Sequence, residues 1–237
     1  MAVGTFQRVE KKYLLKKETY LQLKEKLFLH MHQDEYGKHT ISNIYYDTKM
    51  DDLIRRSIEK PVYKEKFRVR SYGVPKKDST VFLEIKKKYK GIVYKRRIAM
   101  TLQEAKDYLE KGIAPKEQGQ IFREIDYMLH YYEGIAPKLY LAYDRRAWIG
   151  NEDENLRITF DTNIRSRRTD MFLEHGDYGT KLLDEQMYLM EIKVPGAFPL
   201  WLSAILNELE IYPVSFSKYG NIYKKNLGGI EICSQVS

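Results

Sequence analysis

Pairs of charged residues two positions apart recur along this chain, usually with an apolar residue between them. The pairs are Arg68 and Arg70, Glu84 and Lys86, Lys95 and Arg97, and Glu191 and Lys193. Side chains alternate across a β-strand, so residues two apart share one face. Each face is basic and carries single carboxylates, an arrangement that suits binding of a metal-complexed polyanion such as a phosphate chain.

Other charged residues extend this set. Glu10 and Lys12 share a face with Arg8, although charged edge strands often look like this. Arg145 and Arg157 each add a cation from a later segment, and Lys218 lies near an expected helix start, where it could face phosphate or be a surface lysine.

Each pattern has an alternative interpretation. A lone Arg68-x-Arg70 pair is usually solvated, but similar spacing in the next two expected strands favours a shared site. For the hairpin that carries Glu84 and Lys95, the alternative is a set of cross-strand salt bridges, which contribute little at a surface. Arg96 is expected to point to the apolar side. The loop expected after residue 162 carries three arginines that form a rim patch or are solvated: Arg165, Arg167 and Arg168.

The carboxylates among these cations have two chemical roles. They can neutralise excess charge, or they can hold a divalent ion that bridges phosphate oxygens, because Mg²⁺ and Mn²⁺ prefer oxygen ligands. Metal binding is favoured for Glu191, and both roles stay open for Glu84 and Glu10.

The elements that must position these residues are mostly strands. Alternation predicts strands at 6–15, 41–47, 61–73, 80–88, 92–100, 138–148, 155–162 and 187–194. Helices are expected at 19–27, 101–112, 121–132, 200–209 and 217–225. These elements predict one α+β domain over residues 1–237, with a core at about 6–225 and a tail at 226–237. About eight antiparallel strands are expected to close into a barrel, with the charges inward and helices on its apolar outer face.

Composition narrows the function classes. The 237 residues contain 41 Lys+Arg and 33 Asp+Glu, and the net charge of +8 favours anionic partners. The single Cys233 excludes an intrachain disulfide and is compatible with the cytosol. No signal peptide or membrane span is expected, so a cytoplasmic protein is predicted, which could still dock on a membrane-bound partner. The five histidines lack metal-ligand spacing, and no Gly-rich phosphate loop, Rossmann fingerprint or nucleophile elbow is present, so conventional acyl transfer or nicotinamide chemistry is not expected.

Nine motifs in order resemble the VTC domain of polyphosphate polymerases, in a stand-alone prokaryotic form. They are Glu10-x-Lys12-Tyr13, Ser42–Asp47, Phe67–Gly73, Val81–Lys86, Tyr94–Arg97, Tyr143–Arg145, Leu156–Asp161, Met190–Lys193 and Phe216–Tyr219. The resemblance implies a triphosphate tunnel metalloenzyme that uses Mn²⁺ or Mg²⁺ and moves the γ-phosphate of ATP onto polyphosphate. Arg8 stands where the related CYTH phosphatases have the first Glu of Glu-x-Glu-x-Lys, which argues against that branch.

The resemblance also implies residue roles. The implied phosphate-binding set is Lys12, Arg68, Arg70, Lys86, Lys95, Arg97, Arg145, Arg157, Lys193 and Lys218. Within the site, the residues expected to act on the reacting phosphates are Arg68, Arg70, Lys95, Arg97 and Glu191, with Glu191 as the metal ligand.

Four functions remain to be distinguished. The first is an ATP-dependent polyphosphate polymerase, and the second is an inorganic or nucleoside triphosphatase that uses the same lumen. The third is a module that binds polyphosphate without turnover. Nucleic-acid binding ranks last, because the basic residues are spaced for one strand face and most tyrosines fall on apolar faces.

Overall fold

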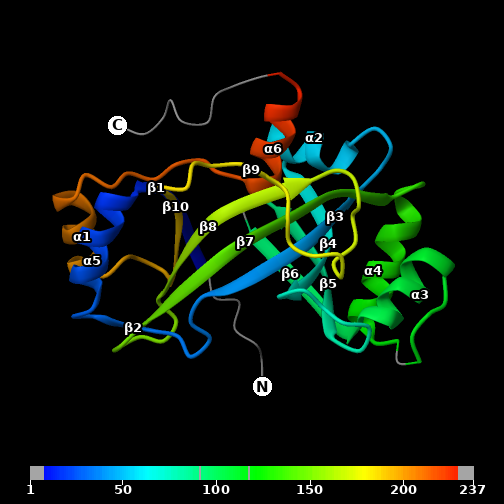
Figure 1. Cartoon of the computed structure of the whole chain (residues 1–237), viewed down its shortest axis with the longest axis horizontal. Coiled ribbons are helices and arrows are strands. Elements are labelled where there is room, and N and C mark those ends of the chain that lie inside the picture. The colour runs from blue at the N-terminus through cyan, green and yellow to red at the C-terminus, as the bar shows by residue number, and fades with distance from the viewer. Residues whose placement is uncertain (1–7, 91, 117, 229–237) are drawn as a thin grey trace.

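The computed structural model describes residues 8–90, 92–116 and 118–228, which form one curled sheet with helices around it (Figure 1). The strands are β1 (Arg8–Lys16), β2 (Met31–Gln33), β3 (His39–Asp47), β4 (Tyr63–Tyr72), β5 (Thr80–Tyr89), β6 (Ile92–Thr101), β7 (Ala136–Gly150), β8 (Arg157–Arg167), β9 (Thr180–Lys181) and β10 (Met187–Pro195). The helices are α1 (Lys17–Leu27), α2 (Asp52–Glu59), α3 (Leu102–Lys111), α4 (Gln120–Tyr131), α5 (Leu200–Glu208) and α6 (Lys218–Asn226). The predicted role of Cys233 lies outside the described residues.

All strand pairings in the sheet are antiparallel, which confirms the α+β prediction. The hydrogen-bonded order is β1-β10-β8-β7-β3-β4-β5-β6, with β2 beside β7 and β9 beside β8. The predicted closed barrel of about eight strands was wrong, because the sheet has ten strands and, within the described ranges, its two ends β1 and β6 are not joined by backbone hydrogen bonds. Alternation identifies the faces of a strand but not its neighbours, which is why closure could not be predicted.

The sheet nevertheless curls far enough for side chains from distant strands to meet. Glu10 on β1 lies 4.0 Å from Lys86 on β5, although five strands separate these two in the hydrogen-bonded order. Lys12 on β1 donates a 3.0 Å hydrogen bond to the backbone oxygen of Phe216, just before α6. The concave face of the sheet is therefore a lumen, bounded at this end by the start of α6.

Helices cover the convex face of the sheet, as the apolar alternation predicts. On one side, α1 and α5 pack with Trp148, Phe160 and Met190. On the other side, α3 and α4 pack with Phe67, Leu83 and Ile85. Figure 1 shows these two helix pairs at opposite ends of the sheet. The apolar residues of these two clusters thus lie on the convex face, away from the lumen.

The lumen is apolar where it meets α6. Leu139 and Leu141 on β7, with Leu189 on β10, pack against Phe216 and Ile222. Further along the same faces the side chains become charged. Each of these strands therefore carries an apolar half that packs on α6 and a charged half that faces the open part of the lumen.

Local signals fix several helix ends. Thr101 and Glu104 form the predicted capping box of α3, and the helix ends at Gly112, whose φ is +71°. The helix α2 was not predicted. Its start depends on the buried Asp47 carboxylate, which accepts hydrogen bonds from the backbone N–H groups of Leu53 and Ile54 at 2.9 and 3.0 Å.

Among the described residues, no helix is long and apolar enough to cross a membrane.

Candidate functional site

The first ion cluster of the lumen centres on Glu84, whose residue is 2% exposed. Arg68 donates to one oxygen of this carboxylate at 2.6 and 2.8 Å, and Lys95 lies 2.8 Å from the other. Burial alone would raise the pKa of Glu84, but Arg68, Arg70 and Lys95 outweigh it and lower the pKa to about 2. Glu84 is therefore an anion that holds three cations from strands β4 and β6.

Neutral polar groups fix the two arginines of β4 as well. The Nε of Arg70 donates to the amide oxygen of Asn43 at 3.0 Å, and its guanidinium reaches the Tyr143 hydroxyl at 3.4 Å. Arg68 donates to the Tyr45 hydroxyl at 2.9 Å. The motif around residues 42–47 thus contributes oriented hydrogen-bond acceptors to the site.

A second cluster forms around the buried Asp161 on β8. Arg145 makes two hydrogen bonds to its carboxylate, at 2.7 and 2.8 Å, and Lys218 from α6 lies 2.5 Å away. Burial would raise the pKa of Asp161, but Arg145 and Lys218 lower it to about 2. The ammonium of Lys218 also lies 4.3 Å from the Tyr143 ring centroid. Asp161 therefore ties the start of α6 to the sheet.

The third cluster contains the predicted metal ligand. Glu191 pairs with Lys193 on its own strand and lies 3.7 Å from Lys12 on β1, which is 3.9 Å from Glu10. Although burial opposes it, Lys193 and Lys12 hold the pKa of Glu191 well below its usual range. Burial lowers the pKa of Lys12, and Glu191 only partly offsets this effect. The ammonium of Lys12 thus lies between two carboxylates from neighbouring strands.

The lumen combines these clusters into a strong excess of positive charge. Its cations are Lys12, Lys66, Arg68, Arg70, Lys86, Lys95, Arg97, Arg145, Arg157, Lys193 and Lys218, and its carboxylates are Glu10, Glu84, Asp161 and Glu191. Ionic contacts join most members directly. Arg97 is placed by register opposite Glu84 and packs 4.8 Å from the Phe82 ring centroid, and Arg157 is exposed opposite Lys193. Nine of the ten cations predicted to bind phosphate therefore share this face, and Lys218 reaches it from α6.

Sequence reasoning missed the roles of three contributors to the lumen. Lys66 lies two residues before Arg68, so the same alternation predicts its orientation. Asp161 has the spacing of the lumen residues but was not assigned a role. Tyr45 is the third, and only the folded neighbourhood of arginines and lysines reveals it: burial would raise its pKa, but Arg68, Lys66 and Arg70 lower it to about 8.

The prediction for Arg165, Arg167 and Arg168 was partly wrong. Arg165 and Arg167 are buried in β8 and lie on the convex face, not in a loop. Asn163 has a φ of +48°, and the β7–β8 register shifts between Ala142 and Asp144, so the alternation beyond Asp161 is displaced.

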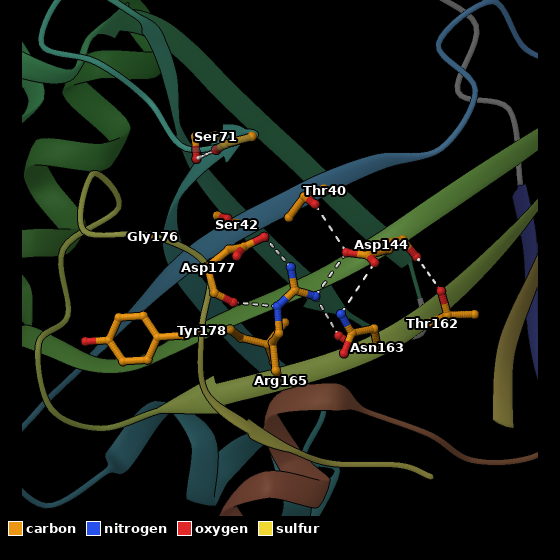
Figure 2. A network of polar contacts seen from close by, with 12 residues as sticks. Thr40, Ser42, Ser71, Asp144, Thr162, Asn163, Arg165, Gly176, Asp177 and Tyr178 are labelled. Carbon is orange, nitrogen blue, oxygen red and sulfur yellow. Dashed lines mark hydrogen bonds and ion pairs between the residues drawn. The ribbon is translucent and has the colours of Figure 1, made fainter. Parts of the chain in front are cut away.

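Arg165 has a structural environment on that convex face. It donates to Asp144 at 3.0 Å and to the backbone oxygen of Asn163 at 2.7 Å, and it also pairs with Asp177 (Figure 2). These contacts fasten the segment that follows β8 to the sheet. Arg96, by contrast, points to the convex side as predicted and lies 3.8 Å from Glu124 of α4.

The donor set fits a hard divalent cation. Glu10 and Glu191 supply carboxylates from adjacent strands, and the buried hydroxyl of Thr159, opposite Glu191 in the register, has no hydrogen-bond partner within the described chain. Among the described residues no group of three or more His, Cys, Asp or Glu could hold a metal by itself. Mg²⁺ is often held by one or two carboxylates with water and substrate phosphates, so these residues fit such an ion.

Comparisons with known proteins agree with this geometry. A family model described as the VTC domain matches residues 7–226. A candidate adenylate cyclase from Bacillus halodurans has a similar structure, with a TM-score of 0.56 and 18% identity over 89% of this chain and 93% of that one. A candidate adenylyl cyclase from Hippeastrum, described as having a dominant triphosphatase activity, gives a TM-score of 0.54 and 15% identity over 96% and 99%. No curated protein sequence matches significantly. At these identities the structural likeness shows the fold.

Proposed function

This chain belongs to the VTC domain family, and on that premise we propose that it is a metal-dependent phosphotransferase that acts on ATP and polyphosphate. The proposed reaction moves the γ-phosphate of ATP onto the end of a polyphosphate chain inside the lumen. The observation that supports it most strongly is the excess of lumen cations over carboxylates, with the buried Glu84 and Asp161 holding arginines in place. Such a lumen is stabilised by an anion that carries several negative charges along its length.

The side chains support this chemistry by positioning and charge. Phosphoryl transfer needs in-line geometry and neutralisation of the equatorial oxygens, with little covalent work by protein groups. Arg68 and Arg70 are already oriented by Glu84 and Asn43, so their guanidinium groups need little rearrangement to bind phosphate. Lys95 provides a further ammonium from β6.

The metal proposal concerns the other side of the lumen. Glu191, Glu10 and the Thr159 hydroxyl would hold Mn²⁺ or Mg²⁺. The ion, when bound, would polarise the bond between the β- and γ-phosphates. Lys12 and Lys193 keep the Glu191 carboxylate ionised and therefore ready to bind a cation.

The acceptor explains why a general base is not needed. The terminal oxygen of polyphosphate is already an anion, whereas water must lose a proton when it attacks. No histidine is among the lumen cations listed above, so none of them is a histidine general base. An acceptor that is already anionic does not need one. The same cations would draw the acceptor into the lumen and reduce its repulsion from the γ-phosphate.

A triphosphatase is the second candidate function. The Hippeastrum protein of similar fold is described as having a dominant triphosphatase activity. The same lumen would serve this reaction if water reached the γ-phosphate in place of the polyphosphate end. The two functions share substrate-binding residues and differ in the acceptor.

One incubation separates these functions. The purified chain is mixed with ATP and Mn²⁺, and ADP, free phosphate and long-chain polyphosphate are measured together, with Arg70→Ala as the site control. ADP matched by polyphosphate supports the polymerase, and ADP matched by free phosphate supports the triphosphatase. Binding of tripolyphosphate without turnover would refute both enzymatic proposals for the isolated chain. Full activity in Arg70→Ala would place the site elsewhere.

A further inference from the structure

Lys66 is a lumen cation outside the predicted phosphate-binding set. It lies on the concave face of β4, two residues before Arg68, and is partly buried. Its ammonium donates to the Ser217 hydroxyl at 3.3 Å and lies 6.0 Å from the Tyr219 ring centroid. Lys66 therefore points to the end of the lumen that is bounded by α6.

The charge of Lys66 is less well compensated than that of its neighbours. Arg68, Arg145 and Lys218 each have a carboxylate within 2.8 Å. Within the described chain, no carboxylate lies within 4.0 Å of Lys66, and its contacts are a hydroxyl and an aromatic ring. Burial lowers its pKa to about 8, and the nearby Tyr45 only partly offsets this effect.

The surrounding groups add to this imbalance. Lys12 on β1, Lys86 on β5 and Lys64 on β4 also lower the pKa of Lys66. A partly buried ammonium surrounded by like charges destabilises the free protein unless an anion binds beside it. Since an ammonium has three N–H donors and Ser217 accepts from one, two remain for such an anion.

Lys66 also extends a row of cations. Lys66, Arg68 and Arg70 occupy alternate positions of one strand, so they are spaced about 6.6 Å apart and span about 13 Å. An anion of one or two phosphates bound at Arg68 and Arg70 does not need to reach Lys66. A longer chain that continues towards α6 meets it.

We propose that Lys66 binds the phosphoryl group nearest α6 and thereby makes the lumen prefer longer phosphate chains over shorter ones. This inference rests on the proposed function of the lumen as a polyphosphate site. It makes Lys66 a binding residue that determines specificity. The structural requirement at this position is small, because an apolar side chain of similar length could pack against Tyr219 without a buried charge.

The test compares two anions on matched variants. Binding of tripolyphosphate and of pyrophosphate is measured by calorimetry at pH 7 and fixed salt, without divalent metal. The variants are Lys66→Met and Lys87→Met, which removes the same charge from the convex face of β5. Lys66→Met is expected to fold, because it removes a poorly compensated ammonium. Thermal unfolding and circular dichroism check this expectation.

Lys66→Met is expected to weaken tripolyphosphate binding about 10- to 100-fold, the usual effect of one or two charged hydrogen bonds. The affinity of Lys66→Met for pyrophosphate should change less than about threefold. Lys87→Met should change the affinities for both anions by no more than this. The role of Lys66 would be overturned if Lys66→Met lost affinity equally for the two anions. It would also be overturned if its loss of tripolyphosphate affinity were no larger than that of Lys87→Met.

Arg70→Ala separates this inference from the proposed function. If Arg70→Ala loses binding while Lys66→Met does not, the lumen is the site and the inference about Lys66 is wrong. If the unmodified chain binds neither anion, or Arg70→Ala binds normally, the proposed function of the lumen fails and the inference fails with it.

Discussion

Replacement of Glu84 by Gln tests whether this carboxylate is the internal counter-ion of the lumen. The pKa of Glu84 is lowered from 4.5 to about 2 by the cations around it. Because one pKa unit corresponds to about 1.4 kcal/mol, the ionised carboxylate contributes about 3 kcal/mol to the free energy of unfolding. Removing one member of a buried ion pair costs a similar amount, about 3–5 kcal/mol. Glu84→Gln should therefore be destabilised by about 3 kcal/mol at pH 7.

The effect should depend on pH in a defined direction. A lowered pKa stabilises the folded state above the unfolded-state pKa near 4.5, and this contribution is lost as the pH falls towards 2. Urea unfolding measures the free energy of unfolding at pH 7 and at pH 3. The difference in this free energy between Glu84→Gln and the unmodified chain should be smaller at pH 3. The exposed Glu154→Gln serves as a control and should change stability by less than about 0.5 kcal/mol.

A bound anion should rescue the variant. In Glu84→Gln, the cations Arg68, Arg70 and Lys95 lack their carboxylate partner, and bound tripolyphosphate can supply negative charge in its place. Saturating tripolyphosphate should therefore reduce the destabilisation to less than about 1 kcal/mol. If Glu84 instead served mainly as a metal ligand, its loss would change metal affinity and tripolyphosphate alone would not restore stability. A destabilisation below about 1 kcal/mol at pH 7, or one that tripolyphosphate leaves unchanged, would refute the counter-ion role.

Three further changes test other parts of the structure. Glu191→Gln should abolish the binding of Mn²⁺ to the protein in the presence of tripolyphosphate, measured by electron paramagnetic resonance, because it removes the carboxylate proposed as the metal ligand. Unchanged Mn²⁺ binding to the protein would place the ligand elsewhere. Tripolyphosphate affinity should fall by about tenfold or more between pH 7 and pH 9, since Lys66 loses a positive charge and Tyr45 gains a negative one with pKa values of about 8; a constant affinity across this range would contradict those pKa values. Thr101→Ala should lower the free energy of unfolding by about 1 kcal/mol, through loss of the α3 capping box, without altering anion binding; an effect on binding would show that α3 is coupled to the lumen.

Much of the architecture was predictable because apolar and charged residues alternate clearly along the strands. Each predicted strand is present, and the capping box at Thr101 and the end at Gly112 set α3 correctly. The unpredicted elements depend on particular contacts and not on alternation. The start of α2 requires the Asp47 carboxylate, and β2 and β9 are short segments defined by pairing with β7 and β8. Such contacts leave little trace in a local pattern.

The site was predictable to the extent that it follows strand faces. Nine of the ten predicted cations share the lumen because each one obeys the alternation of its strand, and the tenth, Lys218, reaches it from the start of α6. Arg165 did not follow this rule, because the irregularity at Asn163 moves it to the convex face. The ion pair of Glu84 and Lys95 agrees with the alternative of cross-strand salt bridges in the hairpin. The pairing of Asp161 with Lys218 was not predictable, since these residues are 57 positions apart and meet only through the fold. The metal and the acceptor remain predictions.

Among the described residues, the two ends of the sheet, β1 and β6, are not hydrogen-bonded to each other, and the outer edge of β1 is bridged at Lys12 to Val214 in the segment before α6. Within the described chain, β1 and the β5–β6 hairpin approach each other through side chains such as Glu10 and Lys86, both of which are partly exposed to water. Such an ion pair is worth at most about 1 kcal/mol, whereas parting any other two neighbouring strands would break a row of backbone hydrogen bonds. Apart from the bridge between Lys12 and Val214, the seam between β1 and the β5–β6 hairpin is therefore the weakest boundary of the lumen within the described chain. A polymer much longer than the lumen could be laid in through this seam along its length, without the need to thread one end through a closed ring.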